Sequence, residues 1–312
     1  MLRRELGRAL ERGSLRGPTA LALARVWQRF ADPVRPVALP PGAHVIGVGG
    51  ATLGGAGKSP VVLALARALA PDVAVVASSY RARLSGARRV RADDSVERVG
   101  DEALWLARAL GQVPVIVGKS RDQALALAAR HARCVIVDGL LQARPQRLGC
   151  SLLVLDADAP WGARCCPPAG DLRASRQRCL AAADAVLTTG AVEAPIPVFR
   201  FLAPLSGVID ASGERRPIAS LALLRLGLVL AIARPERVRA QLRALGITPA
   251  VVELHADHAR LPDRRAPVDA WVTTAQCATK LGATRGGAPV WVLEQRVELP
   301  PEIVALASPP GS

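Results

Sequence analysis

Aromatic side chains are scarce in this chain of 312 residues, where Phe, Trp and Tyr together make up 3% of the sequence. Proteins that bind single-stranded nucleic acids stack the bases on aromatic rings. We therefore expect no nucleic-acid partner, although the formal net charge is +15. That charge instead favours an anionic membrane surface or a phosphorylated substrate.

Paired cysteines and long apolar runs are also missing. None of the six cysteines belongs to a C-x-x-C pair or to a His/Cys cluster with metal-ligand spacing. This pattern predicts reduced thiols and a cytoplasmic location. The sequence has no run of about 18 apolar residues that could span a bilayer. It also lacks the apolar core and the small-residue cleavage site of a secretory signal, so we expect none.

A glycine-rich segment follows the first strongly apolar stretch. Residues 44–49 are predicted to form a strand and residues 60–69 a helix, with residues 50–59 (GATLGGAGKS) between them. A strand, a glycine-rich loop ending in Lys-Ser and a helix form the arrangement of a phosphate-binding P-loop. Glycine lets backbone N–H groups point at phosphate oxygens, and the helix N-terminus favours negative charge. We therefore expect nucleotide phosphates at this loop.

The loop departs from the strict P-loop pattern at Thr52, where a glycine is usual. A glycine-rich turn without a ligand is the alternative, but the flanking strand and helix favour the P-loop. The chain has only three lysines, and the one in this loop, Lys58, suggests a role that a guanidinium cannot fill. Lys58 is predicted to contact the β- and γ-phosphates, and Ser59 to bind Mg²⁺. The residues expected around the nucleotide are Thr52, Leu53, Gly54, Gly55, Ala56, Gly57, Lys58 and Ser59.

Short apolar strands alternate with helices along the rest of the chain. We predict strands at 73–77, 113–117, 134–138, 152–156 and 185–189, and helices at 102–110, 121–130 and 175–183. A second alternating block follows the Pro- and Gly-containing linker 190–197, with strands at 226–233, 250–254, 270–274 and 290–293 and a helix at 236–245. Apolar strands between helices are typical of a parallel sheet covered on both faces.

This alternation predicts an α/β fold: a P-loop NTPase-like domain with a mainly parallel sheet, plus a second, smaller α/β domain. We place an N-terminal segment at residues 1–35, the nucleotide-binding domain at 36–200 and the smaller domain at 201–312.

The N-terminal segment is predicted to form two short amphipathic helices. Their apolar stripes are Leu2, Leu6 and Leu10 in the first, and Leu23, Val26, Trp27 and Phe30 in the second. Arginines flank both stripes. Basic amphipathic helices that carry Trp and Phe can lie in a membrane interface. The alternative is a helix packed on the domain core with its arginines in solvent, which the sequence alone slightly favours.

Three positions outside the loop could contribute to chemistry. Asp138 ends an apolar strand, as does the aspartate that assists Mg²⁺ in P-loop proteins. Asp101 and Glu102 open a helix, where acidic residues are ordinary capping partners. Helix N-termini of a parallel sheet also gather at the edge where ligands bind, so Asp101 is a candidate base. His258 follows Asp257 in the second block, although single histidines are more often structural.

Taken together, these segments resemble the tetraacyldisaccharide 4′-kinases, the lipid A kinases of Gram-negative bacteria. The family's loop V-G-N-L-T-V-G-G-T-G-K-T-P matches residues 48–60 in register and also has threonine at the place of Thr52. Further matches are S-R-G-Y-G near 79–82, G-D-E-P at 100–103, D-D-G-F-Q-H at 137–142, P-A-G-P-L-R-E at 168–174, G-R-P-E-R-F at 233–238 and D-H-H at 257–259. Their order and spacing hold from about residue 45 to residue 281.

The resemblance implies that the γ-phosphoryl group of ATP is transferred, with Mg²⁺, to the 4′-hydroxyl of an acylated glucosamine disaccharide 1-phosphate in lipid A and lipopolysaccharide biosynthesis. It implies catalytic roles for Lys58, Asp101 and His258, with His258 coming from the second domain to pair with Asp101. Ser59 and Asp138 are the implied Mg²⁺ ligands. The candidate substrate contacts are Glu102, Gln142 and Arg173.

A lipid substrate changes the expectation for the N-terminal helices. Because the acyl chains stay in the bilayer, the resemblance implies a peripheral protein on the cytoplasmic face of the inner membrane. The helices then become an anchor on an anionic surface.

The motifs also depart from the family in places. Val137 replaces the first Asp of D-D-G, Leu141 and Gln142 replace the Gln-His pair, and residues 274–281 lack the Glu and Asp of T-E-K-D-A-V-K-L. Two alternatives therefore stay open. One is a P-loop nucleotide-binding switch, although no guanine-reading Asn-Lys-x-Asp segment is present. The other is a catalytically weak family member with a binding or regulatory role. The sequence sets no oligomeric state.

Overall fold

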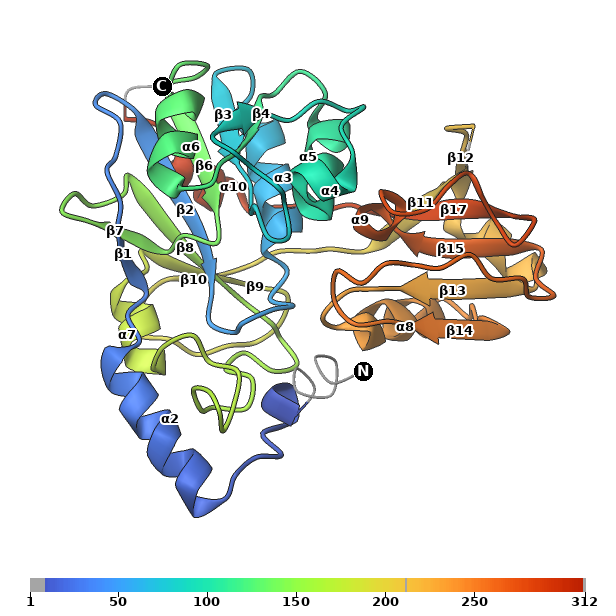
Figure 1. Ribbon diagram of the computed structural model, residues 1–312, viewed down its shortest axis with the longest axis horizontal. Coiled ribbons are helices and arrows are strands. Elements are labelled where there is room, and N and C mark those ends of the chain that lie inside the picture. The colour runs from blue at the N-terminus through green and yellow to red at the C-terminus, as the bar shows by residue number, and fades with distance from the viewer. Residues whose placement is uncertain (1–8, 211, 311–312) are drawn as a thin grey trace. The chain divides into compact units, whose positions relative to one another are not determined.

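The computed structural model describes residues 9–210 and 212–310. The chain divides into two compact units (Figure 1). Unit 1 is Met1–Leu202 together with Glu298–Ser312, and unit 2 is Ala203–Val297. Both units combine helices with largely parallel strands, so the predicted α/β class is confirmed.

An eight-stranded sheet forms the centre of unit 1. Its order is β10 (Val198–Arg200), β9 (Ala185–Thr188), β8 (Cys150–Leu155), β2 (His44–Gly50), β6 (Cys134–Asp138), β3 (Val73–Val76), β5 (Val115–Val117) and β4 (Arg88–Arg89). All neighbours pair in parallel except β4, which is antiparallel to β5. Every residue of β6 and β8 is buried, as expected for strands covered on both faces.

Four helices of unit 1 pack apolar residues on this sheet: α3 (Lys58–Ala68), α5 (Asp101–Leu110), α6 (Arg121–Ala128) and α7 (Arg176–Ala181). The short helix α4 (Val96–Val99) contacts α5. Helix α3 contacts α5 and strands β2, β3 and β6. Because the strands beside β2 run parallel to it, the loops that follow β2 and β6 lie at the same edge of the sheet.

Two parts of unit 1 differ from the expectation. The proline-rich connector contains β1 (Val34–Pro36), which pairs in parallel with β7 (Gln142–Arg144). The chain also returns to unit 1 at its end, so the expected smaller domain at 201–312 is wrong over its last residues. Helix α10 (Pro301–Ala307) is held there because Ile303 and Ala307 are fully buried and the Ala307 carbonyl lies 2.9 Å from the His44 ring.

Unit 2 has its own sheet, in the order β12 (Arg215–Pro217), β11 (Leu205–Ile209), β17 (Ala288–Gln295), β15 (Ala270–Thr274), β13 (Leu226–Leu230) and β14 (Val251–Leu254), with β16 (Thr284–Arg285) beside β17. Strands β13, β14, β15 and β17 are parallel, whereas β11 and β12 are antiparallel additions. The helical segments are η1 (Ile218–Leu223), α8 (Pro235–Ala244) and α9 (Ala275–Ala278). Leu228, Leu230 and Leu242 are fully buried in its core.

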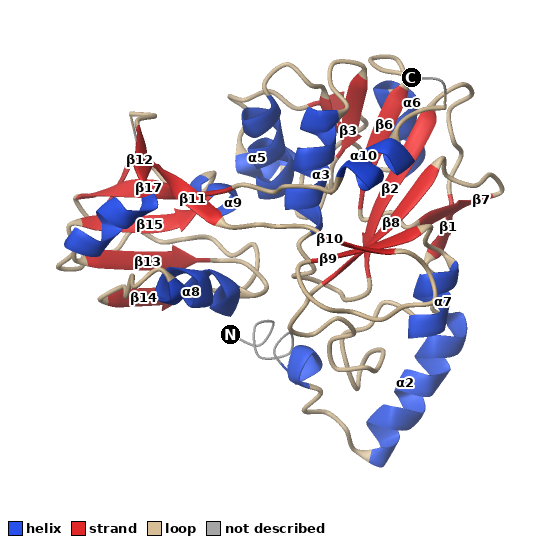
Figure 2. Cartoon of the chain, turned by 180° about the vertical axis from the view of Figure 1, so that it is seen from behind, coloured by secondary structure: helices blue, strands red, loops and turns tan. Residues whose placement is uncertain are grey.

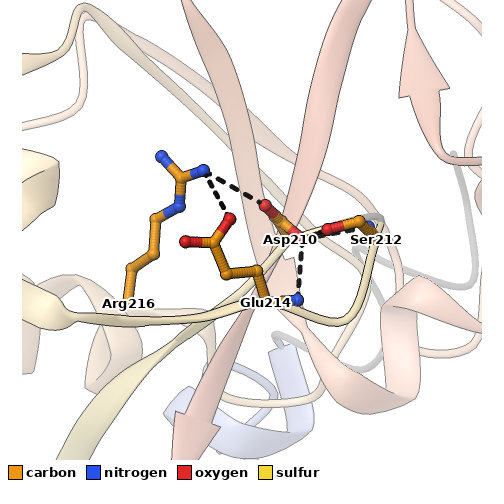
Figure 3. A network of polar contacts seen from close by, with 4 residues as sticks. All are labelled: Asp210, Ser212, Glu214 and Arg216. Carbon is orange, nitrogen blue, oxygen red and sulfur yellow. Dashed lines mark hydrogen bonds and ion pairs between the residues drawn. The ribbon is translucent and has the colours of Figure 1, made fainter.

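The turn between β11 and β12 is organised by one carboxylate (Figure 3). Oδ1 of Asp210 accepts hydrogen bonds from the Ser212 hydroxyl at 2.6 Å and from the N–H groups of Ser212 and Glu214, both at 2.9 Å. The Ser212 hydroxyl is the main cause of a lowered pKa at Asp210, and Arg216, 3.4 Å away, adds to it. The guanidinium of Arg216 also lies 5.0 Å from the ring centre of Trp291, so the network is connected to the core of unit 2.

Helix α2 (Pro18–Phe30) extends away from the sheet of unit 1 (Figures 1 and 2). Among its residues only Ala24 is buried, and the apolar stripe is exposed: Leu23 by 58%, Val26 and Trp27 by 53% each, and Phe30 by 82%. The alternative of a stripe packed on the core is therefore wrong for this helix. The side chain of Arg178 on α7 holds its C-terminal end through the carbonyls of Gln28, Arg29 and Ala31.

The first predicted helix lies mostly outside the described residues, which include Leu10 but neither Leu2 nor Leu6. Over residues 9–210 and 212–310, every helix is too short or too polar to cross a membrane.

Candidate active site

The glycine-rich loop leads from β2 into α3, as its sequence predicts. Gly55 and Gly57 have φ angles of +73° and +85°, which side chains other than glycine rarely adopt. Thr52 has no such angle. Thr52 is buried and pairs with Leu172 in an isolated β-bridge, and its hydroxyl donates to the Gly54 carbonyl at 2.9 Å. The backbone at position 52 therefore tolerates a side chain, and threonine supplies a bond that glycine cannot.

A second segment, residues 167–174, braces the loop. The Leu53 N–H donates to the Asp171 carbonyl at 2.9 Å, and the Arg173 N–H donates to the Ala51 carbonyl at 2.8 Å. The Arg173 guanidinium adds bonds to the carbonyls of Thr52 at 2.8 Å and Leu53 at 3.1 Å. Hydrogen bonds with Asp171 and Arg173 thus fix the conformation of the loop, and the Arg173 side chain contacts it directly.

The N-terminus of α5 lies beside the start of α3. The hydroxyl of Ser59 donates to Oε1 of Glu102, which joins the two helices at the loop. The neighbouring Asp101 is 4% exposed, and its Oδ1 accepts the Glu102 N–H at 2.9 Å. Lys58 and Ser59 are the first residues of α3. Lys58, Ser59, Asp101 and Glu102 are therefore brought together, as the motif analysis expects.

Gly100 sets the direction in which α5 leaves the preceding chain. Its φ angle is +88°, and a Cβ there would lie 3.2 Å from the carbonyl oxygen of Tyr80. Any larger residue would be strained and would press on the backbone that follows β3. The glycine of the Gly-Asp-Glu motif is thus explained by the approach of two chain segments.

Asp138 ends β6 directly beside Val48 of β2. Its side chain is buried, and Oδ1 has no hydrogen-bond partner among residues 9–210 and 212–310. A buried carboxylate oxygen without a partner is costly unless a cation or its water binds there. Mg²⁺ is held by one or two carboxylates together with substrate phosphates. The residues present therefore fit Mg²⁺.

Arg121 and Arg173 interact electrostatically with this carboxylate, and Arg35 interacts with both of these arginines. The Arg121 side chain donates to the Gly139 carbonyl at 2.9 Å. Burial lowers the pKa of Arg121, the positive charge of Arg35 lowers it further, and Asp138 opposes both. The pKa of Arg173 is also lowered, first by burial and then by Arg35. Three arginines interact with one another here and two of them with Asp138, so positive charge exceeds negative charge among these four residues, which suits an anionic ligand.

Arg35 and Arg121 were missed from the sequence, although Arg121 carried a signal. It lies in the first turn of α6, where the helix dipole disfavours a cation. An arginine placed there against the dipole points to another interaction. Gln142, a predicted substrate contact, is buried at the start of β7, four residues after Asp138 and opposite Val34 of β1.

The remaining predicted residue, His258, belongs to unit 2. It lies in the loop after β14, has a φ angle of +56°, and donates its N–H to the Ala231 carbonyl at 3.1 Å. Its ring Nε2 is 3.5 Å from Oδ2 of Asp257, and its Nδ1 is 3.4 Å from Nε2 of Gln276. Its pairing with Asp101 of unit 1 stays a prediction.

Thiol chemistry is not favoured at this site. All six cysteines are free. Burial raises the pKa of Cys134 and Cys179 to about 11 and that of Cys150 to about 12. These thiols stay protonated near neutral pH, and a protonated thiol is a poor nucleophile.

Comparison with known proteins agrees with this geometry. Residues 19–307 match the family model described as tetraacyldisaccharide-1-P 4′-kinase. A tetraacyldisaccharide 4′-kinase from Dichelobacter nodosus is 35% identical over 227 residues, covering 70% of this chain and 67% of the relative. One from Nitrobacter winogradskyi is 38% identical over 225 residues, covering 70% and 66%.

The fold has a solved counterpart. The crystal structure of LpxK from Aquifex aeolicus in complex with ATP superposes with a TM-score of 0.71 over 98% of both chains, at 22% identity. The curated relatives match over about two thirds of their own length. The resemblance drawn from the motifs is confirmed: the chain belongs to the tetraacyldisaccharide-1-P 4′-kinase family.

Proposed function

We propose that this protein transfers the γ-phosphoryl group of ATP to the 4′-hydroxyl of tetraacyldisaccharide 1-phosphate, a step of lipid A biosynthesis. The hydrogen bond from Ser59 to Glu102 carries the proposal, together with the family assignment. It joins the phosphate-binding loop to the helix that begins with Asp101. A carboxylate beside the terminal phosphate is what a kinase needs to receive the proton of an attacking hydroxyl.

The loop side of the site binds the nucleotide. Backbone N–H groups of residues 54–58 and the Lys58 ammonium hold the phosphate oxygens and offset their negative charge. Ser59 and Asp138 would hold Mg²⁺, which supplies further charge neutralisation when bound. The braces from Arg173 and Asp171 keep the loop in one conformation, so little reorganisation is needed on binding.

The acceptor side supplies the base. Asp101 is buried at the N-terminus of α5, where the helix dipole favours the ionised carboxylate. The sugar oxygen attacks the γ-phosphorus, the bond to the bridging oxygen of ADP breaks, and the hydroxyl proton passes to Asp101. His258 pairs with Asp101 when unit 2 closes over the substrates. Closure also excludes water and so suppresses ATP hydrolysis.

Direct assay tests the activity. The purified protein is incubated with Mg-ATP and tetraacyldisaccharide 1-phosphate in detergent, and the lipid is scored for a second phosphate. ATP hydrolysis that ignores the lipid would instead favour a nucleotide-binding switch. Normal Mg-ATP binding without transfer would favour a binding or regulatory family member.

Arg35, Arg121 and Arg173 are proposed to bind the acceptor's anionic groups, and Gln142 and Glu102 its hydroxyl groups. Arg121 gives the cleaner test, because Arg173 also braces the loop. We expect Arg121→Gln to raise the KM for the lipid by roughly tenfold, the effect of losing one charge-assisted hydrogen bond. The KM for ATP should change little. Steady-state kinetics with each substrate varied in turn measures both values.

Arg130→Gln is the matched control, since Arg130 is exposed just past the other end of α6. It should leave both KM values unchanged. A rise confined to the KM for ATP in Arg121→Gln would assign this arginine to the nucleotide instead.

The exposed stripe of α2 is proposed to dock this kinase on the cytoplasmic face of the inner membrane. Leu23, Val26, Trp27 and Phe30 are exposed side by side, and Arg25 and Arg29 flank them. Apolar rings in the interface and arginines on anionic headgroups both favour binding. Such docking would bring the enzyme to a substrate whose acyl chains remain in the bilayer.

Replacing both Trp27 and Phe30 by serine should lower the partition coefficient onto anionic vesicles by about tenfold or more. Flotation on vesicles containing phosphatidylglycerol measures this, and added salt should weaken binding by the wild type. Leu223→Ser is the control, because Leu223 is 90% exposed but lies in unit 2. Equal flotation of the double variant and the wild type would contradict the anchor.

A further inference from the structure

The loop that carries His258 is tied to α9 through one backbone residue of unit 2. Ala231 follows β13, and its carbonyl accepts the N–H of His258 at 3.1 Å. Its own N–H donates to Sγ of Cys277 on α9 at 3.2 Å. Thr274 caps the same helix by accepting the Cys277 N–H at 3.4 Å. The histidine loop and the first turn of α9 therefore keep a fixed separation.

The far end of the same loop is fastened by a buried ion pair. Arg285 is 1% exposed, pairs with the buried Glu253, and donates to the Pro262 carbonyl. Its guanidinium lies 4.8 Å from the ring centre of Trp271. The Gly286 N–H adds a bond to Oδ1 of Asp263 at 2.6 Å. With both ends held, the loop presents His258 in one backbone conformation.

The two ring nitrogens of His258 face different groups. Nε2 is 3.5 Å from the Asp257 carboxylate, which can only accept a hydrogen bond when ionised. In the neutral ring the proton then belongs on Nε2, and Nδ1 is an acceptor. The group facing Nδ1, at 3.4 Å, is the side-chain amide of Gln276, which can donate. Each nitrogen is thus matched to a group of the opposite kind.

We propose that Gln276 is a positioning residue that keeps the proton of neutral His258 on Nε2 by donating to Nδ1. This rests on the proposed function, in which His258 pairs with the Asp101 carboxylate. A ring protonated at Nε2 carries one proton there, so donating it to Asp101 requires that proton to leave the contact with Asp257. Gln276 also limits rotation of the ring about its side-chain bonds. Its contribution is to orientation and tautomer, and it does not touch the reacting atoms.

Three substitutions of similar length separate a donor from a mere space filler. Gln276→Lys keeps a donor, Gln276→Met has neither donor nor strong acceptor, and Gln276→Glu presents an acceptor. We expect Gln276→Met to lower kcat about three- to tenfold. Gln276→Glu should lower it further, because the carboxylate draws a proton to Nδ1. Gln276→Lys should lose less activity than either. The KM for ATP should stay within about twofold throughout.

The tautomer itself is measured by ¹⁵N–¹H correlation spectra of the imidazole rings in the full-length protein. The chain has only four histidines, so comparison with His258→Gln assigns the signal. The wild type and Gln276→Lys should show a proton on Nε2 alone, whereas Gln276→Glu should show a proton on Nδ1 as well, because both nitrogens then face a carboxylate. Gln241→Met in α8 is the matched control and should leave the spectrum unchanged, since Gln241 bonds the Ala203 carbonyl instead.

The inference is overturned if Nδ1 of His258 stays without a proton in Gln276→Glu, or if Gln276→Met and Gln276→Lys lower kcat equally. The spectrum needs no substrate, so this readout stands even if the kinase assay fails. Conversely, a normal kinase with an unmoved tautomer would refute the role of Gln276 alone.

Discussion

Lys58→Met is expected to lower kcat for phosphoryl transfer by roughly 10² to 10³-fold or more, and to weaken ATP binding as well. The ammonium at the start of α3 is the only lysine in the phosphate-binding loop. It offsets negative charge that increases on the phosphoryl oxygens in the transition state. Removing one such donor from other active sites costs this much in kcat. The kinase assay and titration with a fluorescent ATP analogue measure the two effects.

Lys58→Arg tests whether the positive charge of Lys58 is enough or whether an ammonium group is required. If positive charge alone mattered, arginine would serve, and this chain uses arginine almost everywhere else. The planar guanidinium is wider than an ammonium and has a different donor geometry, so we expect Lys58→Arg to be nearly as inactive as Lys58→Met. Arg67→Met, at the other end of α3, is the control and should retain activity. Substantial turnover by Lys58→Arg would contradict a specific role for the ammonium.

Much of unit 1 could be predicted because its buried strands are short, continuous runs of apolar residues. Residues 134–138 are continuously apolar until Asp138, and the structure begins and ends β6 at those residues. Helix α3 instead begins at Lys58, two residues before the predicted start, because Lys58 and Ser59 were both assigned to the loop before Pro60. Proline is tolerated in the first turn of a helix, so it marks the start only approximately.

The elements that the sequence did not predict depend on contacts between segments that are far apart in the chain. Strand β1 follows Pro33 and ends at Pro36. Prolines favour an extended backbone, but only the pairing with β7 makes this segment a strand. The return of residues 298–312 to unit 1 rests on burial of α10, which no local pattern reveals. The arginine cluster was hidden for the same reason, since Arg35, Arg121 and Arg173 meet only in the folded chain.

The exposed stripe of α2 shows another limit of prediction from the sequence. An amphipathic pattern predicts a helix with one apolar face, but it does not say what covers that face. For α2 the protein's own core does not, since Phe30 is 82% exposed. The membrane anchor expected from the family's lipid substrate stays a prediction. The contact between Ser59 and Glu102 was likewise not predicted, since the motifs indicated one as a Mg²⁺ ligand and the other as a candidate substrate contact. For Asp101, spacing alone favoured simple capping.

Asp101→Asn is expected to lower kcat by about 10² to 10⁴-fold while the dissociation constant for Mg-ATP changes little. The substitution keeps the size of the side chain and an oxygen that can accept the Glu102 N–H. It removes only the ability to take a proton, and general-base catalysis is worth this range. Glu97→Gln in α4 is the control, because Glu97 is an exposed acidic residue. Unchanged turnover of Asp101→Asn would reject its assignment as the base.

His258→Ala is expected to lower kcat as well, and the double variant Asp101→Asn/His258→Ala tests whether the two residues act together. Groups that act as a unit are strongly non-additive, because once one is lost the other has nothing left to assist. The double variant should therefore be little worse than Asp101→Asn alone. If instead the two losses in kcat multiply, His258 acts independently of Asp101. Because the residues belong to different units of the chain, this cycle also tests whether the units close on each other during turnover.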